Sequence, residues 1–485
     1  MRPASGGSGL ARRGTPDAAM LNDPIVALAT PPGRSALAVI RLSGTGVFDI
    51  ARRVIPTFHH DPPREARLAS FRDATGELID RGLYLVFPGP RSETGEDMVE
   101  FHSHGGHQVP ARLLAAIESA GARPAHPGEF TRRAVLNGKL DLLQAEAVGD
   151  LVDAEAPAQS RAALLQLEGG LSRRIGELRS ALVELLALLA YDVDFPEEDD
   201  GVIPRERIEA ARADVADRID RLLATAPLAE RVRRGALVVL AGPPNAGKSS
   251  LFNALLGTSR ALVTEIPGTT RDAIEAHADF LGWPVRLVDT AGLGETSDRI
   301  DALGQAMSRR YAEGADLVVY CTEAEGREGR EGGTAGEAMA EGREGGKAGE
   351  AAKNSRPAVP PDRLLQVRTK SDLAPEGGDP AILRTSAMTG AGLDQLRRRI
   401  AERLFSGGVA LADLEPALTR ERHRVALARA AQALANARPE LARGGDAVLA
   451  AHHVQEAVRA LDSLIGLVDV EEVLDRVFAS FCVGK

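Results

Sequence analysis

A phosphate-binding loop constrains the fold of this chain more than any other stretch of its sequence. Residues 237–250, LVVLAGPPNAGKSS, form an apolar run followed by a glycine-rich turn, a lysine and two serines. Every fixed position of the pattern G-x-x-x-x-G-K-[ST] is filled, by Gly242, Gly247, Lys248 and Ser249. In this pattern backbone N–H groups close on a β-phosphate, the lysine reaches the β- and γ-phosphates, and the hydroxyl binds Mg²⁺.

The flanks of the loop support a nucleotide site. Residues 237–241 have the composition of a buried parallel strand, and residues 250–256 begin a helix. A strand, a turn and a helix form the context in which this loop binds nucleotides. We therefore expect the nucleotide to contact the loop and the start of the helix, at Asn245, Ala246, Gly247, Lys248, Ser249 and Ser250.

Two later motifs have the character of nucleotide switches. The segment GTTRD at 268–272 supplies Thr270, a threonine that can complete the coordination of Mg²⁺. After an apolar strand predicted at 285–288, the run Asp289, Thr290, Ala291, Gly292 supplies an aspartate and a sensor of the γ-phosphate. The next residue is Leu293, which cannot orient an attacking water as a glutamine can.

Two further segments predict which base the bound nucleotide carries. Thr369, Lys370, Ser371 and Asp372 end in a carboxylate that can accept both N1–H and N2–H of guanine, a pairing that adenine cannot make. A backbone N–H of Ser386 and Ala387 can reach O6. The sequence therefore predicts GTP rather than ATP. Threonine replaces the usual asparagine at Thr369, so we expect a lower nucleotide affinity and an unchanged base.

Composition limits the other classes of protein. A length of 485 residues suits about three domains. No apolar run approaches the ~20 residues of a membrane span. The net charge of −10 gives no support for RNA binding, because the overall electrostatic field of the protein repels a negatively charged partner. Two cysteines exclude a disulfide framework and a cysteine zinc site, which suits the cytoplasm.

Hydrophobic periodicity predicts the domain organisation. Short strands at 25–29, 36–42 and 83–87 and a helix at 109–119 indicate a small α/β domain over 21–130. Helical spacing then begins at 131, with stripes at Ile175, Leu178, Leu182, Leu185 and Leu189, and at Ile208, Val215, Ile219 and Leu222. Strands alternate with helices over 236–405, and helical spacing resumes over 406–485. We expect one helical domain, 131–235 with 406–485, and a nucleotide domain inserted in it.

Two segments lack a core pattern. Residues 1–20 are basic and rich in small residues, which predicts a disordered tail or a start at Met20; a weak organellar presequence is the alternative. Residues 323–357 repeat glutamate, glycine and arginine, which predicts a disordered insertion; a charged docking arm is the alternative.

Taken together, these residues resemble the MnmE (TrmE) family of tRNA-modification GTPases. The matching segments include DPIVALATPPGR, VIRLSG, FPGPRSETGEDMVEF, RPAHPGEFTRRAVLNGKLDLLQAEAV, DFPEED, GPPNAGKSS, GTTRD, DTAGL and FCVGK. The resemblance implies an N-terminal α/β domain similar to folate-binding domains, a discontinuous helical domain and an inserted Ras-like P-loop GTPase domain. It also implies a homodimer, through the N-terminal domain and head-to-head GTPase domains.

The family's function follows from the same resemblance. With a separate FAD protein, MnmG (GidA), such a protein adds an aminomethyl or carboxymethylaminomethyl group to C5 of the wobble uridine of certain tRNAs. A tetrahydrofolate would deliver the one-carbon unit. By resemblance, Arg41, Glu100, Lys139 and the terminal Lys485 would bind the folate, and Cys482 is a candidate for chemistry near the one-carbon unit, with a buried thiol as the alternative. Cys321 is expected in the core.

The resemblance also assigns the ions. Mg²⁺ would be held by Ser249 and Thr270. K⁺ would take the place of an arginine finger, bound by Asn245, Thr264, Ile266 and Thr269, of which Thr264 and Thr269 also border the GTP. Asp301 stands where the family has a glutamate that positions the attacking water. The side chain of Asp301 is one methylene shorter, so the sequence leaves the rate of hydrolysis open.

Two other functions remain open at this stage. A regulatory GTPase switch of the ribosome-assembly type would need no folate chemistry. A metalloenzyme could use His102, His104 and His107, whose spacing is H-x-H-x-x-H. Strand alternation would place His102 and His104 on one face, but not His107.

Overall fold

The computed structural model describes residues 23–194, 203–257, 274–289, 310–323, 359–373, 379, 381–405, 414–442, 445–466, 477–478, 481–482 and 484. The tail predicted over 1–20 and the insertion predicted over 323–357, Glu323 excepted, lie outside these residues. Internal contacts divide the chain into two compact units. Unit 1 comprises Met1–Glu146 and Ile465–Lys485, and unit 2 comprises Ala147–Leu464.

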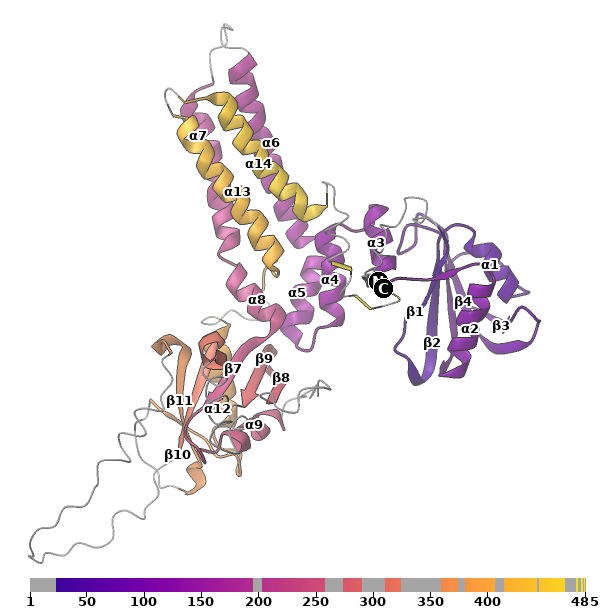
Figure 1. Ribbon diagram of the computed structural model, residues 1–485, viewed down its shortest axis with the longest axis horizontal. Coiled ribbons are helices and arrows are strands. Elements are labelled where there is room, and N and C mark those ends of the chain that lie inside the picture. Colours follow the sequence, from indigo (N-terminus) through magenta and orange to yellow (C-terminus); the bar gives the residue numbers. More distant parts are fainter. Residues whose placement is uncertain are drawn as a thin grey trace, which may run out of the picture. The chain divides into compact units, whose positions relative to one another are not determined.

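Unit 1 is built on a six-stranded sheet with the order β3-β4-β5-β2-β1-β6 (Figure 1). Its strands are β1 (Ile25–Leu28), β2 (Gly33–Ser43), β3 (Arg67–Arg72), β4 (Leu78–Phe87), β5 (Met98–Gly106) and β6 (Arg123–Pro124). Neighbouring strands are antiparallel except β1 and β6, which are parallel. The strands predicted at 25–29, 36–42 and 83–87 correspond to β1, which ends one residue earlier, and to parts of β2 and β4.

Two helices cover one face of this sheet. They are α1 (Val47–Val54) and α2 (Gln108–Ser119), the second of which was predicted at 109–119. Their apolar sides pack in one cluster with alternate strand residues such as Ile40 and Leu42 of β2 and Val99 and Phe101 of β5. Alternation leaves Arg41 and Glu100 on the opposite face, away from this core.

The chain's last residues pack in unit 1. Here α3 (Glu129–Leu136) and the start of α4 (Leu142–Val152) form a cluster with Val477, Phe478 and Phe481. The sequence placed 406–485 with the helices of the middle domain, whereas contacts assign Ile465–Lys485 to unit 1. The two phenylalanines account for this, because they pack directly over Gly128, where a Cβ would lie 2.9 Å from each of them.

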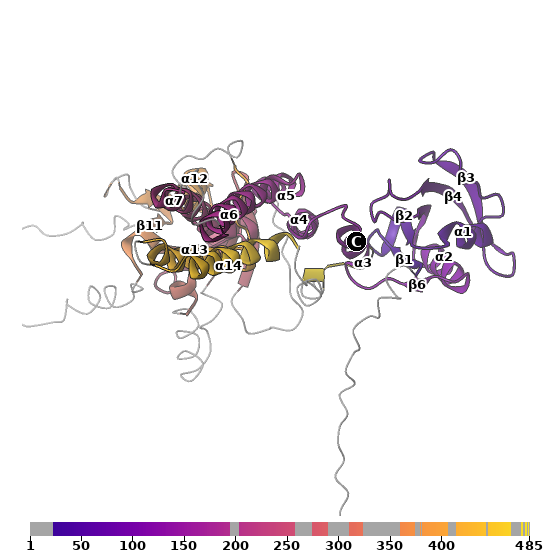
Figure 2. The same ribbon diagram turned by 90° about the horizontal axis from the view of Figure 1, so that it is seen from above.

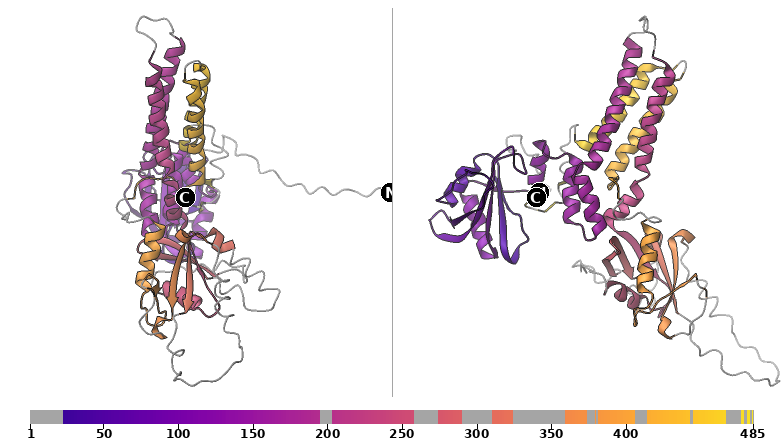
Figure 3. Two further views of the ribbon diagram at one scale, coloured as in Figure 1. Left: turned by 90° about the vertical axis from the view of Figure 1, so that its left-hand side faces the viewer. Right: turned by 180° about the vertical axis from the view of Figure 1, so that it is seen from behind.

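The helices of unit 2 include four that run alongside one another (Figure 2 and Figure 3). These are α6 (Gly170–Asp194), α7 (Arg205–Leu223), α13 (Glu421–Glu440) and α14 (Ala447–Ile465). The predicted stripes are confirmed, because Ile175, Leu178, Leu182, Leu185 and Leu189 of α6 and Ile208, Val215, Ile219 and Leu222 of α7 are all buried. Two shorter helices are α5 (Pro157–Leu167) and α8 (Ala226–Arg234), and the second sheet follows α8 in the chain.

The second sheet has the order β12-β11-β10-β7-β9-β8. Its strands are β7 (Ala236–Ala241), β8 (Ile274–Phe280), β9 (Trp283–Asp289), β10 (Leu317–Glu323), β11 (Leu364–Thr369) and β12 (Leu383–Arg384). All neighbouring pairs are parallel except β8 with β9. The helices α9 (Lys248–Leu256) and α12 (Leu393–Leu404) share the core of this sheet. The α/β and helical architecture expected from the sequence is confirmed.

No helix in the described part of the chain is long and apolar enough to span a membrane.

Candidate functional site: a phosphate loop and a charged sheet face

The phosphate loop has the backbone geometry that its pattern requires. Gly242 has φ +143°, and a Cβ at this position would lie 2.2 Å from the carbonyl oxygen of Cys321 on β10. Asn245 and Gly247 also have positive φ, 61° and 74°, and α9 begins at the next residue, Lys248. Successive N–H groups therefore converge at a helix N-terminus, which is a site for anions.

Lys248 is held inside the loop. Its side chain is buried, and its Nζ donates to the carbonyl oxygens of Gly242 at 3.0 Å and Pro243 at 2.9 Å. A buried ammonium needs such partners, because burial without them is unfavourable. The charge is thus placed where the pattern requires it, in the concavity of the loop.

Parallel strands bring the nucleotide motifs to one edge of the sheet. The carboxyl ends of β7, β9, β10 and β11 lie together, since these four strands are parallel. The phosphate loop follows β7, and the buried Asp289 ends β9 beside Leu240 of β7. This edge is where open α/β sheets bind their ligands.

Thr369 ties the base motif to the phosphate loop. It ends β11 and is buried, and its Oγ1 donates to the carbonyl oxygen of Ala246 at 2.6 Å. The carbonyl oxygen of Thr322 lies at 3.1 Å from the same hydroxyl. The residue that departs from the usual asparagine therefore forms a buried hydrogen bond between two motifs that are distant in sequence.

The two segments predicted to contact the base are hydrogen-bonded to each other. Ser371 N–H donates to the carbonyl oxygen of Thr385 at 3.1 Å, which places Asp372 beside Ser386 and Ala387. Asp372 is exposed. Lys370 has φ +55°, and its Nζ pairs with Glu323 at the end of β10, 2.9 Å away.

Several predicted residues lie outside the described part of the chain. They are Thr264, Ile266, Thr269, Thr270, Thr290, Ala291, Gly292, Asp301 and Lys485. Of the predicted ion ligands, Asn245 and Ser249 are described, and both are exposed at the loop. Cys321 is buried in the core as expected, and burial raises the pKa of its thiol to about 12.

A second cluster occupies the open face of the sheet in unit 1. Arg41 of β2 and Glu100 of β5 are register partners, and Arg41 Nε donates to Glu100 Oε1 at 3.0 Å. Arg41 Nη1 also pairs with Glu93 at 2.8 Å, and His102 Nε2 lies 3.3 Å from the other oxygen of Glu100. Glu93 and His102 were not assigned to this site from sequence, because only strand register and a returning loop bring them to Arg41 and Glu100.

Lys139 holds the loop that supplies Glu93. Its Nζ donates to the carbonyl oxygen of Pro90 at 2.9 Å, and Asn137 Nδ2 donates to that of Thr94 at 2.8 Å. Of the predicted folate residues, the structure therefore pairs Arg41 with Glu100 directly, and connects Lys139 to them through the loop 88–97.

The C-terminal segment lies beside the start of α3 and the end of β1. The carbonyl oxygen of Cys482 accepts from Gly128 N–H at 3.2 Å, and the Cys482 residue is exposed. A Cβ on Gly484 would lie 2.4 Å from the carbonyl oxygen of Leu28. Since β1 pairs with β2, this segment ends one strand away from the strand of Arg41.

A buried ion cluster fixes α3 in unit 1. Arg133 is 2% exposed and pairs with Glu96 and Asp23, each at 3.0 Å, and with Glu129 at 3.4 Å. Arg123 pairs with the same Glu129 at 2.5 Å. Burial by itself raises the pKa of Glu129, but hydrogen bonds from Arg123 and the His126 N–H outweigh it, so the pKa lies below its ordinary value.

The histidine spacing does not assemble a metal site in the described part of the chain. His102 faces Glu100, whereas His104 Nδ1 lies 2.9 Å from Asp80, and His107 precedes α2. Among the described residues no group of three His, Cys, Asp or Glu side chains could hold a metal ion. These contacts explain the positions of His102 and His104 without a metal.

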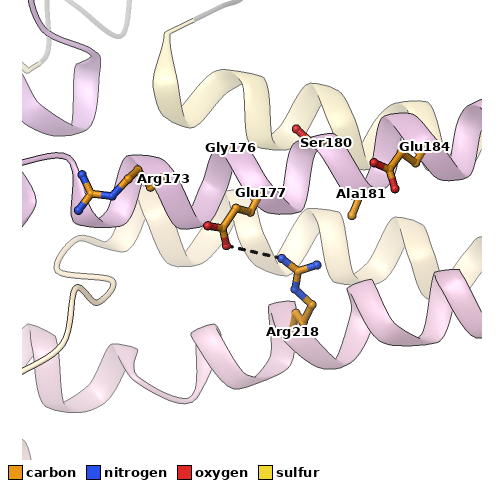
Figure 4. Close-up of a pocket in the computed structure, with 7 residues that line it drawn as sticks. All are labelled: Arg173, Gly176, Glu177, Ser180, Ala181, Glu184 and Arg218. Atoms are coloured by element: carbon orange, nitrogen blue, oxygen red, sulfur yellow. Dashed lines mark ion pairs between the residues drawn. The ribbon is translucent and has the colours of Figure 1, made fainter.

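An open groove of about 580 Å³ lies elsewhere, between α6 and α7 (Figure 4). It is lined by Arg173, Gly176, Glu177, Ser180, Ala181, Glu184 and Arg218, and Glu177 and Arg218 face each other at 3.8 Å. None of the residues predicted for GTP or folate lines this groove.

Comparison with known proteins decides the family. The family described as the N-terminus of the GTP-binding protein TrmE matches residues 24–139, and the family described as the MnmE helical domain matches residues 142–482. A curated tRNA modification GTPase MnmE from Thermus thermophilus is 44% identical over 473 residues, covering 96% of this chain and 100% of the relative.

The chain belongs to the MnmE family.

Other MnmE proteins are similarly close along their whole length. The MnmE of Azorhizobium caulinodans is 42% identical over 472 residues, and that of Aquifex aeolicus is 37% identical over 466 residues. Each alignment covers 96% of this chain and 99% or 100% of the relative. Among solved structures, the G domain of the T. maritima FeoB iron transporter is 26% identical, with a TM-score of 0.24, over 35% of this chain and 98% of that one. The MnmE resemblance predicted from sequence is confirmed.

Proposed function

We propose that this chain is a GTP hydrolase that acts in tRNA modification, as the names of its MnmE relatives state of them. Two hydrogen bonds carry the nucleotide assignment. The Thr369 hydroxyl bonds to the phosphate loop, and Ser371 bonds to Thr385, so the phosphate and guanine motifs form one connected edge. Mg²⁺ fits this edge, because Ser249 in the first turn of α9 offers a hydroxyl and Asp289 at the end of β9 offers a carboxylate.

The test of the base is Asp372→Asn. The amide can donate where the carboxylate accepted. We therefore expect the variant to bind GDP more weakly, and xanthosine diphosphate more tightly, each by about 2–3 kcal/mol relative to the wild type. Fluorescent nucleotide titration measures both affinities. Asp379→Asn, a neighbouring surface carboxylate, is the control and keeps GDP preference. An Asp372→Asn variant that still prefers GDP would contradict the assignment of the base.

The finer function has its support in the cluster of unit 1. We propose that Arg41, Glu100, Lys139 and Lys485 bind a one-carbon tetrahydrofolate, and that an FAD-containing partner of the MnmG type completes the addition to C5 of the wobble uridine. A carboxylate suits the N3–H and amino group of a pterin, and cations suit its glutamate tail. The Glu100 carboxylate, already held in place by Arg41, fits this task.

Folate binding is tested by calorimetric titration with 5-formyltetrahydrofolate. Glu100→Gln loses at least about 1.5 kcal/mol of binding, because a charged hydrogen-bond acceptor is lost. Glu77→Gln, an exposed carboxylate in the same unit, is the matched control. In cells, deletion of the gene removes the wobble-uridine modification seen by mass spectrometry of tRNA. If the deletion strain keeps the same level of this modification as the wild-type strain, the result would favour a regulatory GTPase without folate chemistry.

The proposals about K⁺ and about a dimer are supported by the resemblance to the family. We propose that K⁺, bound by Asn245, Thr264, Ile266 and Thr269 of paired GTPase domains in a cytoplasmic homodimer, speeds hydrolysis, with Asp301 positioning the water. Hydrolysis then runs faster in K⁺ than in Na⁺, and Asn245→Ala removes the difference. Equal rates of the wild-type chain in the two salts would exclude this role of Asn245. Asp301→Glu keeps or raises the rate, and Asp301→Ala lowers it. An alanine variant with an unchanged rate would mean that the acid that positions the water lies elsewhere.

A further inference from the structure

The β8–β9 hairpin is a stiff element between the nucleotide edge and the helices of unit 2. Its turn consists of Leu281 and Gly282, both with positive φ, 57° and 90°, between the paired residues Phe280 and Trp283. Two such residues form the tight turn that matches the twist of a hairpin. Asp279 also accepts a hydrogen bond from Gly282 N–H, which fixes the turn.

The open end of this hairpin lies at the nucleotide site. Asp289 ends β9, opposite Ile274 of β8, and lies beside Leu240 of β7, two residues before the phosphate loop begins at Gly242. Because β9 is hydrogen-bonded along β7, a shift of β9 changes the place of Asp289 relative to the loop. The hairpin therefore controls the position of one predicted phosphate-site residue.

The turn end of the hairpin is attached to α5 (Figure 1). The carbonyl oxygen of Gly282 accepts from Ala158 N–H, in the first turn of the helix, at 2.9 Å. This bond satisfies one of the N–H groups that a helix start leaves without an internal partner. A side-chain bond adds to it, because His277 Nδ1 of β8 contacts Glu155, just before α5.

The attachment continues into the core and back to the phosphate loop. Ala158 is fully buried in the cluster that contains Leu287 of β9 and Val232 of α8. Gln159 of α5 donates to the carbonyl oxygen of Arg233, at the end of α8, at 3.0 Å. Since β7 begins two residues after α8 ends, each of these elements is joined to the next: α5 to the hairpin, the hairpin to β7, β7 to α8, and α8 to α5.

We propose that Glu155 and Ala158 are positioning residues for GTP hydrolysis, which hold the β8–β9 hairpin so that Asp289 lies correctly beside the phosphate loop. This inference rests on the proposed GTPase function. The coupling runs in both directions, because a contact that biases the nucleotide edge is itself biased by the nucleotide. The helices and the GTP site therefore influence each other through this hairpin.

The test uses the full chain with Glu155→Ala, His277→Ala and the double variant. GTP hydrolysis and the affinity for a fluorescent GDP are measured with Mg²⁺ and K⁺ present. Each single variant lowers kcat by about threefold to tenfold, with GDP affinity within about twofold of wild type, because misplacement affects the transition state more than ground-state binding. The double variant has the kcat of the single variants, since both remove the same contact.

The control is Glu177→Ala, which removes the ion pair with Arg218 on α6 and α7 and leaves kcat unchanged. Unchanged kcat in the Glu155 and His277 variants, or losses that multiply in the double variant, would overturn the inference. So would a fall in activity that matches a fall in the fraction of nucleotide-binding protein, because that result indicates loss of folding alone. A wild-type chain without GTP hydrolysis would overturn the proposed function and this inference together.

Discussion

At the residue scale, Thr369 shows how a departure from a common pattern can preserve a contact. Its hydroxyl has one proton, so only one of its two nearby carbonyl oxygens receives a full hydrogen bond. The shorter distance, 2.6 Å against 3.1 Å, assigns that proton to Ala246 of the phosphate loop. We predicted a lower nucleotide affinity because the usual asparagine is missing. The hydrogen bond from Thr369 to Ala246 opposes that loss, so a variant without the hydroxyl tests how much the bond contributes.

Thr369→Val keeps the shape of the side chain and removes the hydroxyl. The buried carbonyl oxygen of Ala246 then lacks this donor, which costs about 1–3 kcal/mol. We expect GDP to dissociate about tenfold faster in stopped-flow fluorescence. Thr369→Ser retains the donor and should release GDP as the wild type does. Equal dissociation rates for valine and threonine would show that the bond does not support nucleotide binding.

Glu129 provides a prediction of pH dependence. Its folded-state pKa lies below the ordinary value of 4.5, so it stabilises unit 1 above about pH 4.5, and this contribution is lost as the pH falls through the folded-state pKa. Glu129→Gln should lower stability at pH 7 by on the order of 2 kcal/mol. Calorimetry should also find a flatter decline of the unit 1 transition below pH 5. An unchanged acid slope would assign that decline to other carboxylates.

At the element scale, sequence periodicity predicted the long helices and several buried strands but missed β3 and β8. The stripes of α6 and α7 consist of large aliphatic residues at helical spacing, which is a strong signal. In β8 the alternation is carried by Ala276, Ala278 and Phe280, and small alanines give little contrast. In β3 only Ala69 and Phe71 face the core. Short strands with small inward residues are therefore hard to predict.

The start of α3 gives a prediction about packing. Gly128 and Gly138 have almost the same φ, 66° and 67°, but only Gly128 has a side chain packed against its missing Cβ. Gly138→Ala should cost about 1 kcal/mol from backbone strain alone. Gly128→Ala should cost about 1–3 kcal/mol more, because Phe478 and Phe481 must move. Thermal unfolding and the rate of carboxypeptidase digestion compare the two variants. Equal effects would show that the phenylalanines move at little cost.

At the scale of the whole molecule, the sequence names the residues of one candidate site more completely than those of the other. The phosphate loop is a local backbone pattern, so its residues could be named from sequence, and in the structure Gly242 and Gly247 have positive φ. The cluster around Arg41 depends on strand register, which joins Glu100 and His102 to it, and on a loop that returns Glu93. Such contacts are set by tertiary structure, and no spacing in the sequence encodes them.

The two compact units should unfold separately. We expect two calorimetric transitions of the full chain, because contacts within each unit form distinct cores. GDP at about 100 times its Kd should stabilise only the transition of unit 2, by about 2.7 kcal/mol, and 5-formyltetrahydrofolate only that of unit 1. Adenosine diphosphate is the control and should move neither. A single transition shifted by both ligands would mean that the units unfold as one.

Unit 1 is assembled from both ends of its described sequence, with the whole of unit 2 between them. On a ribosome, the sheet and α3 emerge long before Phe478 and Phe481 exist. At about 5–20 residues per second, translation of the intervening unit takes on the order of tens of seconds. During that interval the surface at Gly128 and Leu142 is uncovered. The nascent chain therefore exposes this surface to chaperones and to aggregation until Phe478 and Phe481 are made.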